Sequence, residues 1–275
     1  MIKDPIFLSD PDRTEKWETR RNAVGKRIYM DIETLPPEES VREKLARELY
    51  VERGFGELGV NEAEIEAEAE DRFRDLALQG ELGRLLCVGL VIEENGAVRH
   101  CGVLGRDRET RRFHLDEART LRSFWSLVAG FREGQDLFIG HNILDFDLLF
   151  LYKRSCIHRV RPSVNLSFRR YQSHPVFDTM WEWTKWHNRI SLHDLAQALG
   201  IPSPKESGMN GLSIYNLYQQ GRHEEIAQYC MRDVKCAREV FYRLQYEMAL
   251  PLASYESLMV ETASTRATPP VLAAV

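Results

Sequence analysis

A chain of 275 residues with 43% hydrophobic residues, 29% charged residues and a net charge of −5 is typical of a globular protein and excludes a largely disordered one. No apolar run approaches the roughly 20 residues that span a bilayer, and the charged first residues do not fit a secretory signal peptide. Five scattered cysteines without a CxxC pair fit neither a zinc site nor a disulfide framework, so we expect a cytoplasmic protein without membrane contact.

The hydrophobic pattern predicts an α/β protein. We expect a polar N-terminal arm at residues 1–25, one domain at 26–250 and a flexible C-terminal tail at 251–275. Runs of β-prone residues predict five strands, at 26–31, 85–92, 97–104, 136–140 and 175–178. Helical spacing predicts helices within 38–53, 60–78, 115–131, 144–151, 191–200 and 222–247. A hairpin followed by alternating strands and helices favours a mixed sheet flanked by helices.

The segment 38–78 stands apart by its charge, since it carries thirteen acidic and six basic residues. We interpret it as a helical insertion after the first strand. Its acids could form a solvated helix face, or the segment could bind a protein partner or a second copy of the chain. Because acidic side chains repel nucleic acid, we predict that 38–78 does not line a groove for such a substrate.

The first candidate for chemistry is Asp31-Ile-Glu33, at the end of the first predicted strand. Residues i and i+2 of a strand point to the same face, which places two carboxylates side by side. Their repulsion is costly unless solvent surrounds them or a cation lies between them. Asp107-Arg-Glu109 has the same spacing, but its surroundings predict a surface loop.

The second candidate is the segment 141–147, HNILDFD, which follows a short apolar strand and leads into a helix. Asp147 is followed by four apolar residues, so it is either a partner of the helix dipole or a metal ligand. Asp145 lies closer to the predicted helix start and is the better candidate for helix capping.

The third candidate is the segment 229–233, YCMRD, on the last long helix. Tyr229 and Asp233 are four residues apart, so a helix places both side chains on one face. A core tyrosine beside a surface acid gives the same spacing, and the segment alone does not separate these two interpretations.

Together and in this order, the segments MDIET, HNILDFD and YCMRD resemble the motifs of DEDD-type 3′–5′ exonucleases. The tyrosine four residues before the last aspartate is typical of the DEDDy branch. The chain is similar to the proofreading exonuclease domain of family B DNA polymerases, and to stand-alone predicted exonucleases related to it, over roughly residues 26–247. This resemblance implies a ribonuclease-H-like fold, a mixed five-stranded sheet flanked by helices, here with the acidic helical insertion.

The resemblance also implies a catalytic site. Asp31, Glu33, Asp147 and Asp233 would hold two Mg²⁺ or Mn²⁺ ions, for which carboxylate oxygens are suitable ligands. Asp31 would bridge both ions, Glu33 and Asp233 would complete the site that activates water, and Asp147 would hold the second ion mainly through water. Tyr229 would orient the attacking water, because a phenol with a pKa of about 10 is a poor base at neutral pH.

The implied reaction is stepwise hydrolysis at the 3′ end of DNA, with single strands favoured, and release of nucleoside 5′-monophosphates. The same site could act on RNA, and a non-catalytic nucleic-acid-binding module is a further alternative that the complete set of acids disfavours. The chain is too short to be a family B polymerase itself.

Four residues are candidates for substrate contact. In the family, the residue at Leu35 wedges against the terminal base; packing within the loop is the alternative. His141 and Asn142 lie in the turn of the second motif, where a histidine can also be purely structural. Lys205 could reach a phosphate or remain solvated. The stretch 153–170 holds six basic and no acidic residues, so it could follow the phosphates of a strand.

Overall fold

The computed structural model describes residues 25–53, 61–165, 168–203, 213–249 and 251–252. Nearly all of the predicted arm at 1–25 and tail at 251–275 lies outside these residues. Within the described part of the chain, no helix combines the length and the apolar character that crossing a membrane requires.

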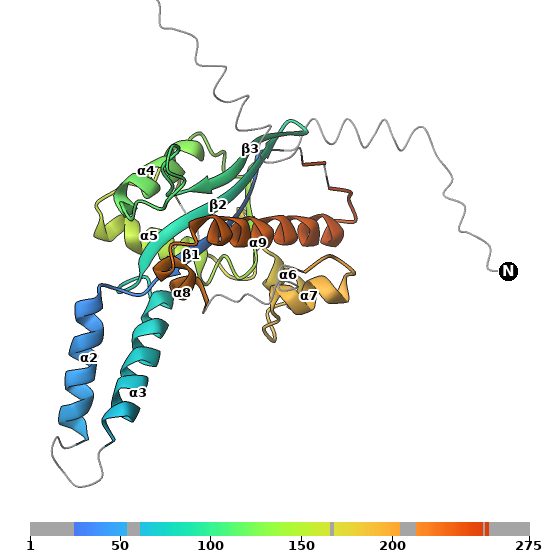
Figure 1. The fold of residues 1–275 in the computed structure, drawn as a ribbon. Coiled ribbons are helices and arrows are strands. Elements are labelled where there is room, and N and C mark those ends of the chain that lie inside the picture. The colour runs from blue at the N-terminus through green and yellow to red at the C-terminus, as the bar shows by residue number, and fades with distance from the viewer. Residues whose placement is uncertain (1–24, 54–60, 166–167, 204–212, 250, 253–275) are drawn as a thin grey trace, which may run out of the picture.

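A mixed five-stranded sheet forms the centre of the fold (Figure 1). Its strand order is β3-β2-β1-β4-β5. The strands are β1 Arg27–Leu35, β2 Arg84–Glu94, β3 Ala97–Leu104, β4 Leu137–Gly140 and β5 Val176–Asp178. β1 pairs antiparallel with β2 and parallel with β4, so the middle strand joins an antiparallel half to a parallel half. The predicted α/β class with a mixed five-stranded sheet is confirmed, and the arrangement is consistent with a ribonuclease-H-like fold.

The strand β1 is longer than the predicted 26–31. Its pairing with β2 continues until Leu35 lies opposite Arg84, and Pro36 follows directly. Proline has no backbone N–H to donate to a sheet, so the strand ends there. Asp31 and Glu33 therefore lie within a paired strand and not at its tip, which fixes their backbone more firmly than the sequence suggested.

Helices cover both faces of the sheet. The three longest helices that pack on the strands are α4 Glu117–Leu127, α5 Asp147–Ile157 and α9 His223–Leu244. Alternate residues of β1 separate the two faces, because Ile28 and Met30 share a hydrophobic cluster with α4 and α5, whereas Tyr29 packs with residues of α9. By the same alternation, Asp31 and Glu33 point to the face that α9 covers.

The acidic segment forms two antiparallel helices that project from the body of the protein (Figure 1). We call this unit, residues 38–78, the helical hairpin. It consists of α2 Glu39–Glu52, α3 Glu62–Asp75 and the short 3-10 helix η1 Leu76–Leu78. A small apolar contact between Ala46, Leu49, Ile65 and Ala69 holds the two helices together. The helices predicted within 38–53 and 60–78 are thus present after β1; that the segment is an insertion into the domain stays a prediction.

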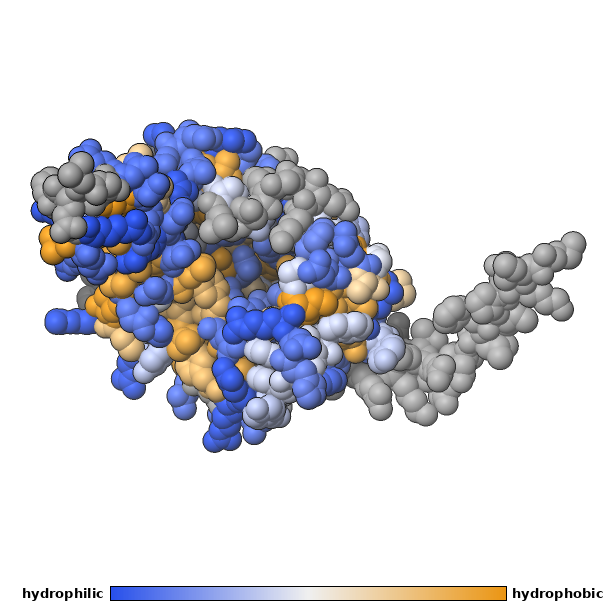
Figure 2. Space-filling view, turned by 90° about the horizontal axis from the view of Figure 1, so that it is seen from below, coloured by the Kyte–Doolittle hydropathy of each residue, from blue (hydrophilic) through white to orange (hydrophobic). Residues whose placement is uncertain are grey.

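Three short helices complete the fold beside α9, namely α6 Thr179–Thr184, α7 Leu192–Ala198 and α8 Ile214–Gln219. Seen from below, apolar residues gather toward the middle of the surface and hydrophilic residues surround them (Figure 2).

Candidate active site

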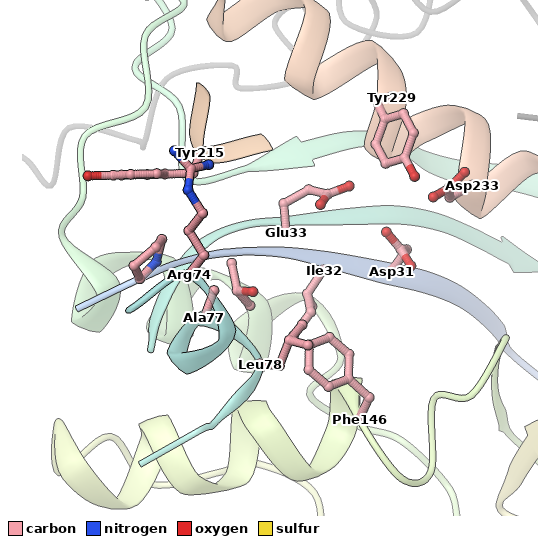
Figure 3. A pocket seen from close by; sticks show the side chains of 12 residues that line it. Asp31, Ile32, Glu33, Arg74, Ala77, Leu78, Phe146, Tyr215, Tyr229 and Asp233 are labelled. Carbon is pink, nitrogen blue, oxygen red and sulfur yellow. The ribbon is translucent and has the colours of Figure 1, made fainter. Parts of the chain in front are cut away.

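A pocket of about 350 Å³ opens where β1, α9 and the base of the helical hairpin meet. Asp31, Glu33, Tyr229 and Asp233 all line it, and Figure 3 shows their polar ends converging from the strand and the helix. The first and third sequence motifs, about 200 residues apart in the chain, are thus brought together. The volume lies at the lower end of the range of about 300–1,000 Å³ that is usual for ligand sites, so the pocket suits one small polar group or one nucleotide.

Tyr229 and Asp233 occupy adjacent turns of α9, as the four-residue spacing predicted. Burial raises the pKa of the Tyr229 hydroxyl, and the charges of Asp233, Glu33 and Asp31 raise it further, as does a hydrogen bond with Asp233. The phenol therefore stays protonated at neutral pH, so it acts as a hydrogen-bond donor and not as a base.

Asp147, the first residue of α5, contacts the backbone of the first motif. Its Oδ1 accepts a hydrogen bond of 3.0 Å from the backbone N–H of Ile32, the residue between the two acids of β1. The side chain is buried, and burial together with the charges of Asp178 and Asp233 raises its pKa to about 7 despite the backbone hydrogen bonds. The second motif thus joins the same acidic cluster.

Asp178 positions the turn that precedes Asp147. Its carboxylate accepts from the backbone N–H of Asn142 at 3.0 Å and of Leu144 at 3.1 Å, and it also caps α6 through Met180 N at 3.0 Å. Burial raises its pKa to about 6 although these bonds favour the charged form. Asp178 therefore fixes the loop between β4 and α5 from the end of β5.

The cluster of four carboxylates is electrostatically strained. Burial raises the pKa of Asp31, and Asp147, Asp233 and Glu33 raise it further through their charges. Burial likewise raises the pKa of Glu33, whose Oε1 is buried without a hydrogen-bond partner among the described residues. A cation at this place would relieve the repulsion and satisfy the free oxygen, and an all-oxygen set suits Mg²⁺ or Mn²⁺. The residues present therefore fit divalent ions.

Cys230 is a member of the site that sequence reasoning missed. Its Sγ lies 3.8 Å from Asp31 Oδ2, and it groups with Asp31 and Glu33 within a span of 4.8 Å. A hydrogen bond with Cys87 and burial raise the pKa of the thiol, so it remains neutral and donates to Asp31. The available signal was its position three residues before Asp233, which is the same face of the helix.

The helical hairpin does contribute to the pocket, which corrects the prediction that 38–78 lies away from it. Arg74, Ala77 and Leu78 are among the lining residues (Figure 3). The prediction used the net charge of the whole segment, but the hairpin residues that line the pocket are one arginine and two apolar residues. Phe146 and Tyr215 line the pocket as well, and neither was singled out from the sequence.

The structure places the four residues predicted to contact substrate in different environments. Leu35 is fully buried in a hydrophobic cluster beneath α8 and α9, so no surface of it is open to a terminal base and the expected wedge is not found. The ring of His141 is engaged on both sides, by Thr179 Oγ1 at 3.0 Å and by the carbonyl of Ile190 at 2.9 Å, which fits the structural alternative. Lys205 lies outside the described residues.

Asn142 remains a candidate substrate contact. Its backbone adopts a left-handed conformation with φ of 59°, which Asp178 stabilises through the N–H of Asn142. Its side-chain Oδ1 is buried and has no hydrogen-bond partner among the described residues.

The basic stretch 153–170 contains one arginine that is buried in an ion pair, while two other basic residues form ion pairs at the surface; the predicted contact with phosphates stays a prediction. Arg154 is buried and forms a 2.6 Å ion pair with Glu117, and Lys153 pairs with Glu81 at the same distance. Arg170 pairs with Asp145 at 3.1 Å. Asp145, which the sequence suggested as a helix cap, is thus an ion-pair partner, and α5 begins without a side-chain cap.

Comparison with known proteins identifies one family. The family model described as "Predicted 3'-5' exonuclease related to the exonuclease domain of PolB" matches residues 78–266. This range contains Asp147, Tyr229 and Asp233 and begins after β1, whose acids the helical hairpin separates from the rest of the chain. No curated protein matches the chain. Because the match covers more than half of the sequence, the chain belongs to this family of predicted 3′–5′ exonucleases related to the PolB exonuclease domain.

Proposed function

We propose that the protein is a metal-dependent 3′–5′ exonuclease that hydrolyses phosphodiester bonds at the 3′ end of single-stranded DNA and releases nucleoside 5′-monophosphates. One observation carries the proposal: four carboxylates and a tyrosine from three distant segments meet in and behind one pocket. The family adds the reaction class, since its members are predicted 3′–5′ exonucleases.

Asp31, Glu33, Asp147 and Asp233 would hold two divalent ions, Mg²⁺ or Mn²⁺. When bound, such ions lower the pKa of water and stabilise charge on the oxygens of a phosphoryl group in transfer. The repulsion among the four acids, described above, is the feature of this chain that favours cation binding.

The protein's own groups have distinct tasks in this proposal. Tyr229, protonated at neutral pH, would turn its single O–H from Asp233, once that carboxylate holds a metal ion, to the attacking water and orient it against the scissile phosphate. Asp147 fixes the backbone between Asp31 and Glu33 through Ile32 N, which keeps both acids in place. Cys230 supports Asp31 from behind through its neutral thiol.

DNA is favoured over RNA as substrate because the family is related to the exonuclease domain of PolB, and a polymerase-linked exonuclease acts on DNA. We propose single strands because one unpaired 3′ nucleotide can enter a pocket of about 350 Å³. A cytoplasmic location is supported by five cysteines that are all free. The helical hairpin has two exposed acidic helices that a protein partner or a second copy could contact.

Cleavage of labelled oligonucleotides tests the proposal. We expect the wild-type protein with Mg²⁺ or Mn²⁺ to shorten 5′-labelled single-stranded DNA one nucleotide at a time, and to release a labelled mononucleotide at once from 3′-labelled DNA. Chelation and the Asp31→Ala variant should both abolish the ladder. The same assay on RNA shows which polymer is preferred. Retained cleavage in Asp31→Ala, or no metal-dependent product from either polymer, would refute the proposed function.

A further inference from the structure

Arg74 at the base of the helical hairpin lines the same pocket as the catalytic acids. Among the twelve described residues that line this pocket, it is the one with a positive charge. A strand of nucleic acid carries a negative charge at every phosphate, and three lining acids repel it. A cation on the wall of the pocket would therefore attract a phosphate of the strand.

An aromatic ring holds the arginine in place. Its guanidinium carbon lies 5.2 Å from the centre of the Tyr215 ring, and that ring packs edge-on against Phe73 at 5.8 Å. Figure 3 shows the Arg74 side chain extended against Tyr215 on the Glu33 side of the pocket. This contact fixes the direction of the side chain without using its N–H groups.

Its ionic partner can be exchanged. Glu70, one turn earlier on α3, pairs with Arg74 at 2.6 Å, and both side chains are partly exposed, at 31% and 26%. Ion pairs at the surface are worth only about 0–1 kcal/mol, and this pair keeps a quarter to a third of each side chain in contact with solvent. A phosphate can therefore compete for the guanidinium, which binds phosphate in a bidentate geometry.

We propose that Arg74 binds a phosphate of the substrate strand next to the scissile bond, which makes the helical hairpin part of the substrate site. The inference rests on the proposed function for the identity of the strand. The acidic hairpin would then have two effects on the strand. Its long helices repel nucleic acid, and Arg74 at its base binds one phosphate. The hairpin would thus direct a single 3′ end toward the acids.

The test compares Arg74→Gln with Arg72→Gln. Arg72 lies on the same helix and forms the same kind of pair, with Glu68 at 2.7 Å, but it does not line the pocket. In the wild-type background we expect Arg74→Gln to lower kcat/KM on single-stranded DNA about tenfold, mainly through KM, the effect of losing one charge-assisted contact. Arg72→Gln should cleave as the wild type does.

Binding is measured separately in full-length protein that carries Asp31→Asn, by fluorescence anisotropy of a labelled single-stranded oligonucleotide at several salt concentrations. Removing one phosphate contact should flatten the slope of log K against log salt by about 0.7. We expect this change with Arg74→Gln but not with Arg72→Gln, and partial recovery with Arg74→Lys. Thermal unfolding of each variant confirms that the hairpin remains folded.

The two proposals fail in different assays. If the wild type cleaves but Arg74→Gln matches Arg72→Gln in KM and salt slope, the role of Arg74 is overturned and the exonuclease remains. If binding depends on Arg74 but no cleavage occurs with any metal, the phosphate contact stands and the exonuclease proposal fails. Absence of oligonucleotide binding overturns the role of Arg74.

Discussion

The variant Asp147→Asn is expected to lose cleavage and to be more stable than the wild type when metal ions are removed. Most substitutions of buried residues destabilise a protein, so the sign of this effect is diagnostic. Cleavage should fall by at least about 10²–10³-fold, because Asp147 is a proposed ligand of an ion that stabilises transition-state charge. The stability gain follows from the environment of the carboxyl.

The gain depends on pH in a defined direction. The folded state raises the pKa of Asp147 to about 7 from its ordinary value of 3.8, so the ionised carboxylate destabilises the metal-free protein. The penalty is absent below pH 4, grows between pH 4 and 7, and reaches on the order of 4 kcal/mol above pH 7. An asparagine has no charge and keeps an oxygen for the N–H of Ile32.

Thermal unfolding in chelator at pH 8 and at pH 4 measures this effect. At pH 8 we expect Asp147→Asn to melt roughly 10 °C above the wild type, and at pH 4 the two should coincide. Asp145→Asn is the matched control, because Asp145 lies in the same turn but pairs with Arg170 and Arg189. It should be no more stable than the wild type at either pH. A destabilised Asp147→Asn at pH 8 would contradict the strained cluster.

The second large effect concerns the stability of the fold and depends on a buried ion pair between α9 and the sheet. Arg238 of α9 and Glu93 of β2 are 1% and 4% exposed, and their closest atoms are 2.5 Å apart. The hydroxyls of Tyr242 and Tyr29 donate to the other oxygen of Glu93 at 2.6 and 3.1 Å. Replacing Arg238 by Met leaves a buried carboxylate without its counter-charge.

Such a loss costs about 3–5 kcal/mol, so Arg238→Met should melt roughly 10 °C below the wild type. Arg243→Met, an exposed arginine one to two turns further along α9, should change stability by less than about 0.5 kcal/mol. Adding Glu93→Gln to Arg238→Met removes the uncompensated charge and should recover part of the loss. If Arg238→Met and the wild type have the same melting temperature, the ion pair does not stabilise the packing of α9 on the sheet, which positions Tyr229 and Asp233.

Much of this site could be predicted from the sequence because its signals are local. Strand alternation placed Asp31 and Glu33 on one face, and helix periodicity placed Tyr229 above Asp233. Both patterns depend only on neighbours in the chain, and both side-chain pairs line the pocket. The mixed sheet also followed from the order of apolar runs and turns.

The remaining features depend on contacts between distant segments. The extension of β1 to Leu35 comes from pairing with β2, and the burial of Leu35 comes from α8 and α9 packing over it. The position of Arg74 in the pocket depends on where the hairpin rejoins β2. No residue spacing in the sequence indicates these contacts. The acidic net charge of the hairpin predicted that it would lie away from the substrate.

Mn²⁺ binding observed by electron paramagnetic resonance shows whether Asp31 belongs to a divalent cation site. The wild-type protein should remove the signal of free Mn²⁺ up to a defined stoichiometry, and Asp31→Asn should lose this binding. Asp107→Asn should bind as the wild type does, because Asp107-Arg-Glu109 has the same spacing but lies in a loop, where Asp107 pairs with Arg119 at 3.1 Å. Equal Mn²⁺ binding by the wild type and Asp31→Asn would contradict the account.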